Sequence, residues 1–167
     1  MDREHLQKMV NFDTERGCFA CGPENPIGLK MEFFTDGKTV YSWPMVSTQL
    51  CGWKSVVHGG IVTTMLDEVM SWAAYQIIRK LILTRSIHVD FMHPVPAERP
   101  LRAEGAVKEI TRDTEGVLTA RLFDDVDRLC AKATGVFALM KPKIARRLGI
   151  IEDSIIDNFE RWLQASP

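Results

Sequence analysis

A long run of mainly apolar residues between positions 59 and 80 dominates the hydrophobic pattern of the chain. Gly59 and Gly60 begin the run, and Arg79 and Lys80 end it, which suits the two ends of a helix dipole. The apolar residues fall on nearly every side of a helix, and a helix that is apolar all round is buried all round. The pattern therefore predicts a helix over residues 59–80 at the centre of the fold.

Four stretches with the pattern of β-strands follow this helix. They cover residues 81–91, 101–110, 116–123 and 129–140. Turns of hairpin length, at residues 113–116 and 124–127, connect the last three. Consecutive strands joined by tight turns pair antiparallel, so these stretches predict an antiparallel sheet.

A β-hairpin is predicted before the helix, over residues 29–46. Asp36-Gly37 is the turn signal, and Pro44 indicates the end or a bulge of the second strand, because proline cannot donate to a sheet. The buried helix needs a cover, and the antiparallel sheet is the cover that the chain offers. We therefore expect an α+β fold in which a curved antiparallel sheet of about six strands wraps a long central helix.

The remaining segments predict short helices and loops. Residues 2–12 and 152–164 carry apolar residues at helical spacing, so we expect a short helix near each end of the chain. Residues 17–28, which are rich in glycine and proline, and residues 47–57 are expected to be loops.

Length and composition fit one globular domain. The 167 residues include 21 basic and 22 acidic side chains, a net charge of −1 that gives no global attraction to nucleic acid or to an anionic membrane. No apolar run approaches the roughly 20 residues of a membrane span, and residues 1–5 do not resemble a signal peptide. We expect a cytoplasmic protein with one domain over 1–167, a core at about 18–140 and a C-terminal helical extension over 141–167.

The start and the middle of the predicted helix carry the most informative residues. Glycines at a helix start leave backbone N–H groups accessible at the positive end of the dipole, where a developing oxyanion can be held. Asp67 and Glu68 lie in the middle of an otherwise apolar helix. A carboxylate in such a place is paired, hydrogen-bonded, protonated or functional, and an ion pair of Glu68 with Arg85 is the purely structural alternative.

The segment from Val57 to Glu68, with His58-Gly59-Gly60 and Asp67 in it, resembles the signature of hotdog-fold acyl-CoA thioesterases of the 4-hydroxybenzoyl-CoA and phenylacetate-pathway type. Three further segments are similar to that family: Cys21 to Leu29, Gly52-Trp53 and Thr84 to Pro96. The resemblance covers roughly residues 18–140. It implies the hotdog fold and a hydrolase that cleaves an acyl or aryl thioester of coenzyme A (CoA).

The resemblance also implies roles for particular residues. Asp67 would be the catalytic carboxylate, as a general base on water or as a nucleophile on the thioester carbonyl. The N–H of Gly59, or less readily of Gly60, would polarise that carbonyl, and His58 would orient the substrate or shape the loop. Thr84 would position the nucleophilic water.

Contacts to the rest of the substrate are expected from Gly60, Gln49, Glu68 and Arg85. Gln49 lies in the loop where some members of the family carry an amide side chain, although Lys54-Ser55 stands where Pro-Gly is common. Arg85 is one of several basic residues that would meet the phosphates of CoA, or would form a solvated basic face instead.

In the family the catalytic site lies between two subunits, with Asp67 on one and Gly59 on the other. The resemblance therefore implies a homodimer or a dimer-of-dimers tetramer. Two other functions stay open. One is a hotdog dehydratase or hydratase, against which the pattern of two glycines and an aspartate argues, and the other is a non-catalytic acyl-CoA-binding protein on the same fold.

Cys18 and Cys21 form a Cys-x-x-Cys pair, which is half of a zinc site, a redox pair or two ordinary thiols. Cys51 and Cys130 are isolated in the sequence and form no second pair. We therefore expect reduced thiols, no metal and no cofactor.

Overall fold

The centre of the fold is the helix α1 (Gly59–Ala73), in a computed structural model that describes residues 4–12 and 17–165. A π-helical turn, Ala74–Ile78, continues α1, and Arg79 ends it in the left-handed conformation with φ 61°. The helix expected over residues 59–80 is therefore confirmed, with its last two residues outside it.

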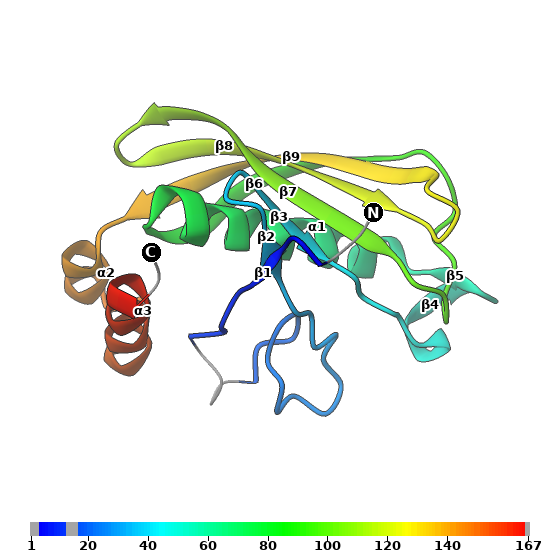
Figure 1. The fold of residues 1–167 in the computed structure, drawn as a ribbon, viewed down its shortest axis with the longest axis horizontal. Coiled ribbons are helices and arrows are strands. Elements are labelled where there is room, and N and C mark those ends of the chain that lie inside the picture. Colours follow the sequence, from blue (N-terminus) through cyan, green and yellow to red (C-terminus); the bar gives the residue numbers. More distant parts are fainter. Residues whose placement is uncertain (1–3, 13–16, 166–167) are drawn as a thin grey trace.

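An antiparallel sheet of seven strands curves over one side of α1 (Figure 1). In their order across the sheet, the strands are β1 (Gln7–Lys8), β2 (Phe34–Thr35), β3 (Thr39–Ser42), β7 (Arg102–Arg112), β8 (Glu115–Phe123), β9 (Leu129–Met140) and β6 (Leu81–Phe91). The four strands after α1 lie within two residues of their predicted bounds. The expected α+β hotdog fold is confirmed, with one strand more than expected in the sheet.

Close approach between α1 and the sheet depends on a glycine of β7. A Cβ atom at Gly105 would lie 2.4 Å from the carbonyl oxygen of Val69, so only a residue without a side chain fits there. The side of α1 that faces the sheet is buried, whereas Thr63, Asp67 and Glu68 on other sides are half-buried. Burial is thus not complete all round, and the half-buried residues include these three polar ones beside the apolar Ile61.

The helix expected over residues 2–12 is wrong for the described residues 4–12, and residues 2 and 3 lie outside the description. Gln7–Lys8 form strand β1 instead, paired with β2, and the N–H of Met9 donates to the carbonyl of Phe33 at 2.9 Å. The extended chain buries Met9 and packs Phe12 against Trp72. This tertiary packing outweighs a helix propensity that is weak in so short a segment.

The predicted hairpin is confirmed around its turn, where Gly37 has φ 88°, but its strands are the short β2 and β3. The residues before β2 pair with the preceding loop, since the N–H of Met31 donates to the carbonyl of Ala20 at 2.9 Å. The loop expected over residues 47–57 contains a 3₁₀ turn (Thr48–Leu50) and a small two-stranded sheet, β4 (Cys51–Trp53) with β5 (Val56–Val57).

Two helices, α2 (Pro142–Leu148) and α3 (Asp153–Ala165), follow the sheet and lie near the end of α1 (Figure 1). Phe159 and Trp162 of α3 pack their rings against Phe12, with centroids 5.2 and 5.7 Å apart. The amphipathic helix expected over residues 152–164 is confirmed as α3. No helix within the described residues combines the length and the apolar composition that a membrane span requires.

Candidate active site

His58 caps the start of α1. Its backbone is extended, and its Nδ1 accepts a hydrogen bond from the N–H of Gly60 at 2.9 Å. Because Nδ1 is the acceptor, the neutral imidazole carries its proton on Nε2. His58 thus shapes the loop that enters the helix, and it occupies the N–H of Gly60.

The N–H of Gly59 is left without an acceptor among the described residues. The next N–H groups of α1 are all used, since Gly60 donates to His58 Nδ1 while Ile61 and Val62 donate to the His58 carbonyl at 2.9 and 3.1 Å. Gly59 is half-buried, and the ring of Phe91 lies beside it. An unpaired amide at the positive end of a helix dipole is suited to bind an oxyanion.

A cleft of about 550 Å³ opens at this helix start. It lies between the β4–β5 hairpin, the first turns of α1 and the chain that leaves β6. Its lining is largely apolar and includes Trp53, Val57, Val62, Phe91, Met92, Pro94 and Val95, together with His58 and Gly59. The cleft is large enough for a small-molecule group, and Gly59 is one of the residues that line it.

Asp67 lies two turns further along α1 and meets Thr84 of β6. The Thr84 hydroxyl donates to Asp67 Oδ1 at 2.9 Å. Burial raises the pKa of the Asp67 carboxyl above its usual value, and the hydrogen bond from Thr84 opposes this shift in part. No cation among the described residues forms an ion pair with Asp67, so its carboxylate keeps the character of a base.

Gly59, Thr63 and Asp67 follow one another at intervals of four residues and share one side of α1. The Thr63 hydroxyl donates to the Gly59 carbonyl at 2.9 Å, which leaves the Gly59 N–H untouched. Gly59 and Asp67 are eight residues apart, which corresponds to about 12 Å along a helix. One thioester carbonyl therefore cannot contact the Gly59 amide and the Asp67 carboxylate of the same chain.

Glu68 lies about 100° round the helix from Asp67 and has different neighbours. Its Oε1 accepts a hydrogen bond from Trp72 Nε1 at 3.0 Å, and burial raises the pKa of its carboxyl to about 7. Its other neighbours are Cys18 and Cys21, whose mutual hydrogen bond lowers the pKa of the Cys18 thiol below its usual value. The structure therefore separates Glu68 from the Asp67–Thr84 pair.

The alternative ion pair between Glu68 and Arg85 is not formed. Arg85 projects from β6 and pairs with Glu115 at 2.6 Å. Other basic residues near the ends of the helices are also engaged, since Lys80 contacts Asp113 and Arg146 contacts Asp157. Binding of CoA phosphates by Arg85 stays a prediction that would require this exposed pair to open.

Gln49 lies in the 3₁₀ turn before β4, with an exposed side chain. The turn is adjacent to the helix start, because the N–H of His58 donates to the carbonyl of Leu50 at 3.0 Å. Gln49 is thus near the cleft but is not one of the residues that line it.

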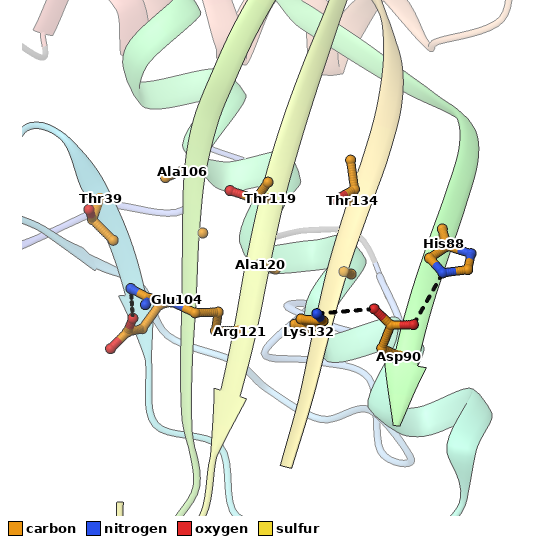
Figure 2. A pocket seen from close by; sticks show the side chains of 12 residues that line it. Thr39, His88, Asp90, Glu104, Ala106, Thr119, Ala120, Arg121, Lys132 and Thr134 are labelled. Carbon is orange, nitrogen blue, oxygen red and sulfur yellow. Dashed lines mark hydrogen bonds and ion pairs between the residues drawn. The ribbon is translucent and has the colours of Figure 1, made fainter. Parts of the chain in front are cut away.

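A second depression, of about 420 Å³, lies on the face of the sheet that is turned away from α1 (Figure 2). Its charged side chains pair with one another, Arg121 with Glu104 at 2.8 Å and Lys132 with Asp90 at 3.5 Å, and the His88 ring lies 3.2 Å from the Asp90 carboxylate. These charges are compensated without a ligand, so the cleft at the start of α1 is the better candidate site.

The contacts of Phe91 and of Trp72 were not predicted from the sequence, which indicated Trp72 only as part of an apolar acyl or aryl pocket. Phe91 lies beside Gly59, and Trp72 binds the carboxylate of Glu68. For Trp72 a signal exists, since residues four apart on a helix are neighbours. For Phe91 there is none, because the contact depends on where the end of β6 lies relative to the start of α1.

Comparisons with known proteins agree with this architecture. Residues 54–131 match the model of the thioesterase superfamily. An uncharacterized protein of Schizosaccharomyces pombe is 30% identical over 105 residues, which are 60% of this chain and 59% of that protein. The chain thus spans about three fifths of the curated relative that it matches.

Solved structures are similar in fold. A thioesterase superfamily protein superposes with a TM-score of 0.66 and 22% identity, over 74% of this chain and 60% of that one. A Streptococcus mutans protein bound to acetyl-CoA superposes with a TM-score of 0.59 and 17% identity, over 66% of this chain and 88% of that one. By its fold the chain has the hotdog architecture, and its residues 54–131 are similar to the thioesterase superfamily.

Proposed function

We propose that the protein hydrolyses an acyl-CoA or aryl-CoA thioester to a free acid and CoA, in sites that two copies of the chain share. The observation that carries this proposal is the polar side of α1, with the unpaired N–H of Gly59 at one end and the Asp67 carboxylate, held by Thr84, further along. The family match supports the reaction class, and the acetyl-CoA bound by the Streptococcus mutans protein supports the substrate class.

In the proposed reaction, Asp67 takes a proton from a water molecule, and the water oxygen attacks the thioester carbonyl carbon. The carbonyl oxygen becomes an oxyanion and accepts a hydrogen bond from the N–H of Gly59 of the partner subunit. The C–S bond then breaks, and the thiolate of CoA takes the proton from Asp67. Direct attack by the Asp67 carboxylate, followed by hydrolysis of the resulting anhydride, would use the same two groups.

The proposal of a shared site rests on two features. The separation of about 12 Å between Gly59 and Asp67 requires a second chain to complete each site. Strand β6 lies at the edge of the sheet and pairs on only one side with a described strand. Apolar side chains are exposed on this strand and just after it: Leu83 at 43%, Phe91 at 58% and Met92 at 48%. Such an edge is suited to pair with another copy.

Release of free thiol from a panel of acyl-CoA and aryl-CoA compounds tests the proposed activity. We expect at least one compound to be hydrolysed with saturable kinetics. Binding of CoA compounds with no thiol release would favour a non-catalytic acyl-CoA-binding protein. The absence of both thiol release and binding would overturn the proposal.

Replacement of Thr84 by valine is expected to move the acid limb of the pH profile of kcat/KM to higher pH. The Thr84 hydroxyl stabilises the charged form of Asp67, so its loss raises the pKa of Asp67 further above the usual value. The measurement is kcat/KM against pH, with Thr119→Val on the outer face of the sheet as a matched control. An acid limb that stays in place or moves to lower pH would contradict the role of Thr84.

Mixing two inactive variants is expected to restore activity. When Asp67→Asn and Gly59→Pro chains are unfolded and refolded together in equal amounts, half of the dimers are mixed, and each mixed dimer has one intact shared site. About one quarter of the wild-type activity per chain should return, by the symmetry of a two-fold interface. Each variant refolded alone is the control. Mixed dimers without activity would mean that the site is not shared.

A further inference from the structure

Cys18, Cys21 and Glu68 form a thiol–carboxylate cluster beside the side of α1 that carries Gly59 and Asp67. Each residue offers one ligand atom, a thiol sulfur or a carboxylate oxygen, and these atoms all lie within 4.8 Å of one another. Two donors come from the loop before β2, and the third comes from the central helix. The fold therefore adds to the Cys-x-x-Cys pair a third donor about fifty residues away in the sequence.

The spacing of these atoms fits a tetrahedral zinc site. With Zn–S bonds of about 2.3 Å and Zn–O bonds of about 2.1 Å, neighbouring ligand atoms in a tetrahedron are about 3.6–3.8 Å apart. Three atoms that already lie within 4.8 Å of one another reach this geometry with small side-chain movements. Two sulfur donors and one carboxylate suit Zn²⁺ better than the oxygen-seeking Mg²⁺ or Ca²⁺.

Groups around the cluster hold its donors in place, as partners of metal ligands do. Trp72 Nε1 donates to Glu68 Oε1 at 3.0 Å and orients the carboxylate. The N–H of Gly22 donates to the carbonyl of Cys18 at 2.9 Å, which closes the turn that brings the two thiols to the same side.

The cluster has no compensating cation among the described residues. None of their lysine, arginine or histidine side chains forms an ion pair with Glu68, and Arg85, the candidate from the sequence, binds Glu115. All three donors are half-buried, and a cluster of desolvated acidic groups is stabilised when a cation joins it.

We propose that Cys18, Cys21 and Glu68 bind one Zn²⁺ ion, with the fourth position open to water or another small ligand. The ion would connect the loop over residues 17–28 to the middle of α1, next to Asp67. The proposal does not depend on thioester hydrolysis, because the zinc ligand Glu68 lies on a different side of α1 from Gly59 and Asp67.

Metal analysis and cobalt substitution test this site without an activity assay. Protein purified under reducing conditions with no added metal is expected to contain about one zinc per chain. After removal of the metal, titration with Co²⁺ should give the near-ultraviolet absorption of thiolate-bound cobalt. Cys18→Ser and Cys21→Ser should weaken Co²⁺ binding by about 100-fold or more, and Glu68→Gln should weaken it by about tenfold or more.

Cys51→Ser is the matched control, since Cys51 lies in β4, outside the cluster, and should leave the cobalt spectrum unchanged. If a ligand variant does not fold, alkylation of the wild type supplies the same information. Bound zinc should protect Cys18 and Cys21 from iodoacetamide and leave Cys51 reactive, as read by mass spectrometry.

Two results would overturn the proposal. One is folded, reduced protein that contains no zinc and gives no thiolate–cobalt absorption. The other is metal-independent reactivity of Cys18 and Cys21 together with a disulfide between them after mild oxidation, which would identify a redox pair instead.

Discussion

Replacement of Asp67 by asparagine is expected to lower kcat for thioester hydrolysis by about 100-fold or more. Asparagine has the same shape, and its Oδ1 can still accept the hydrogen bond from Thr84, but it cannot take a proton from water or attack the carbonyl. The variant should fold as stably as the wild type. The carboxylate that asparagine replaces is desolvated, and no cation among the described residues pairs with it, so its removal costs no ion pair.

Thiol release and thermal unfolding, measured on the same preparations, check this result. Asp113→Asn is the control, since Asp113 is exposed in the β7–β8 turn and contacts Lys80 and Lys141. A normal turnover for Asp67→Asn would exclude Asp67 as base or nucleophile.

Replacement of Gly59 by proline is expected to lower kcat by about 100- to 1,000-fold, the usual effect of removing one oxyanion donor. Proline has no N–H, and it is well tolerated as the first residue of a helix. His58, which would precede it, already has the extended backbone that a residue before proline prefers, with φ −59° and ψ 137°. The substitution therefore removes the unpaired amide and keeps the helix start.

Gly59→Ala separates the loss of the N–H from the addition of atoms. A Cβ at this position would lie 3.5 Å from the Phe91 ring, an ordinary van der Waals contact, and the N–H would remain. We expect Gly59→Ala to keep most of the activity. Equal losses in both variants, with the helix intact by circular dichroism, would show that space beside Phe91, and not the amide, limits the reaction.

Much of the fold could be predicted because hydrophobic periodicity reports burial directly. The long apolar run at residues 59–80 specified α1, and the alternating stretches after it specified β6 to β9. Residues 4–12 were predicted wrongly because their conformation is decided by contacts with β2 and with the aromatic residues of α1 and α3. A nine-residue window contains no information about those distant partners.

The candidate site likewise has features that could be predicted from the sequence and contacts that could not. Gly59 and Asp67 lie on one helix and His58 caps its start, so their spacing is readable from the sequence. Contacts across the fold cannot be read from the sequence. The sequence offered Arg85 as a possible ion-pair partner of Glu68, whereas Arg85 pairs with Glu115 in the structure. The meeting of Glu68 with Cys18 and Cys21 is likewise a property of the folded chain, since it depends on where the loop crosses α1.

The close contact at Gly105 has a consequence for how substitutions in this protein should be scored. Any side chain at position 105 would collide with the backbone of Val69, so such chains would fail to accumulate in a cell. Asp67 variants would accumulate normally and be inert. Loss of activity alone would place both positions in one class, whereas abundance scored beside turnover would distinguish a residue that the architecture requires from one that the chemistry requires.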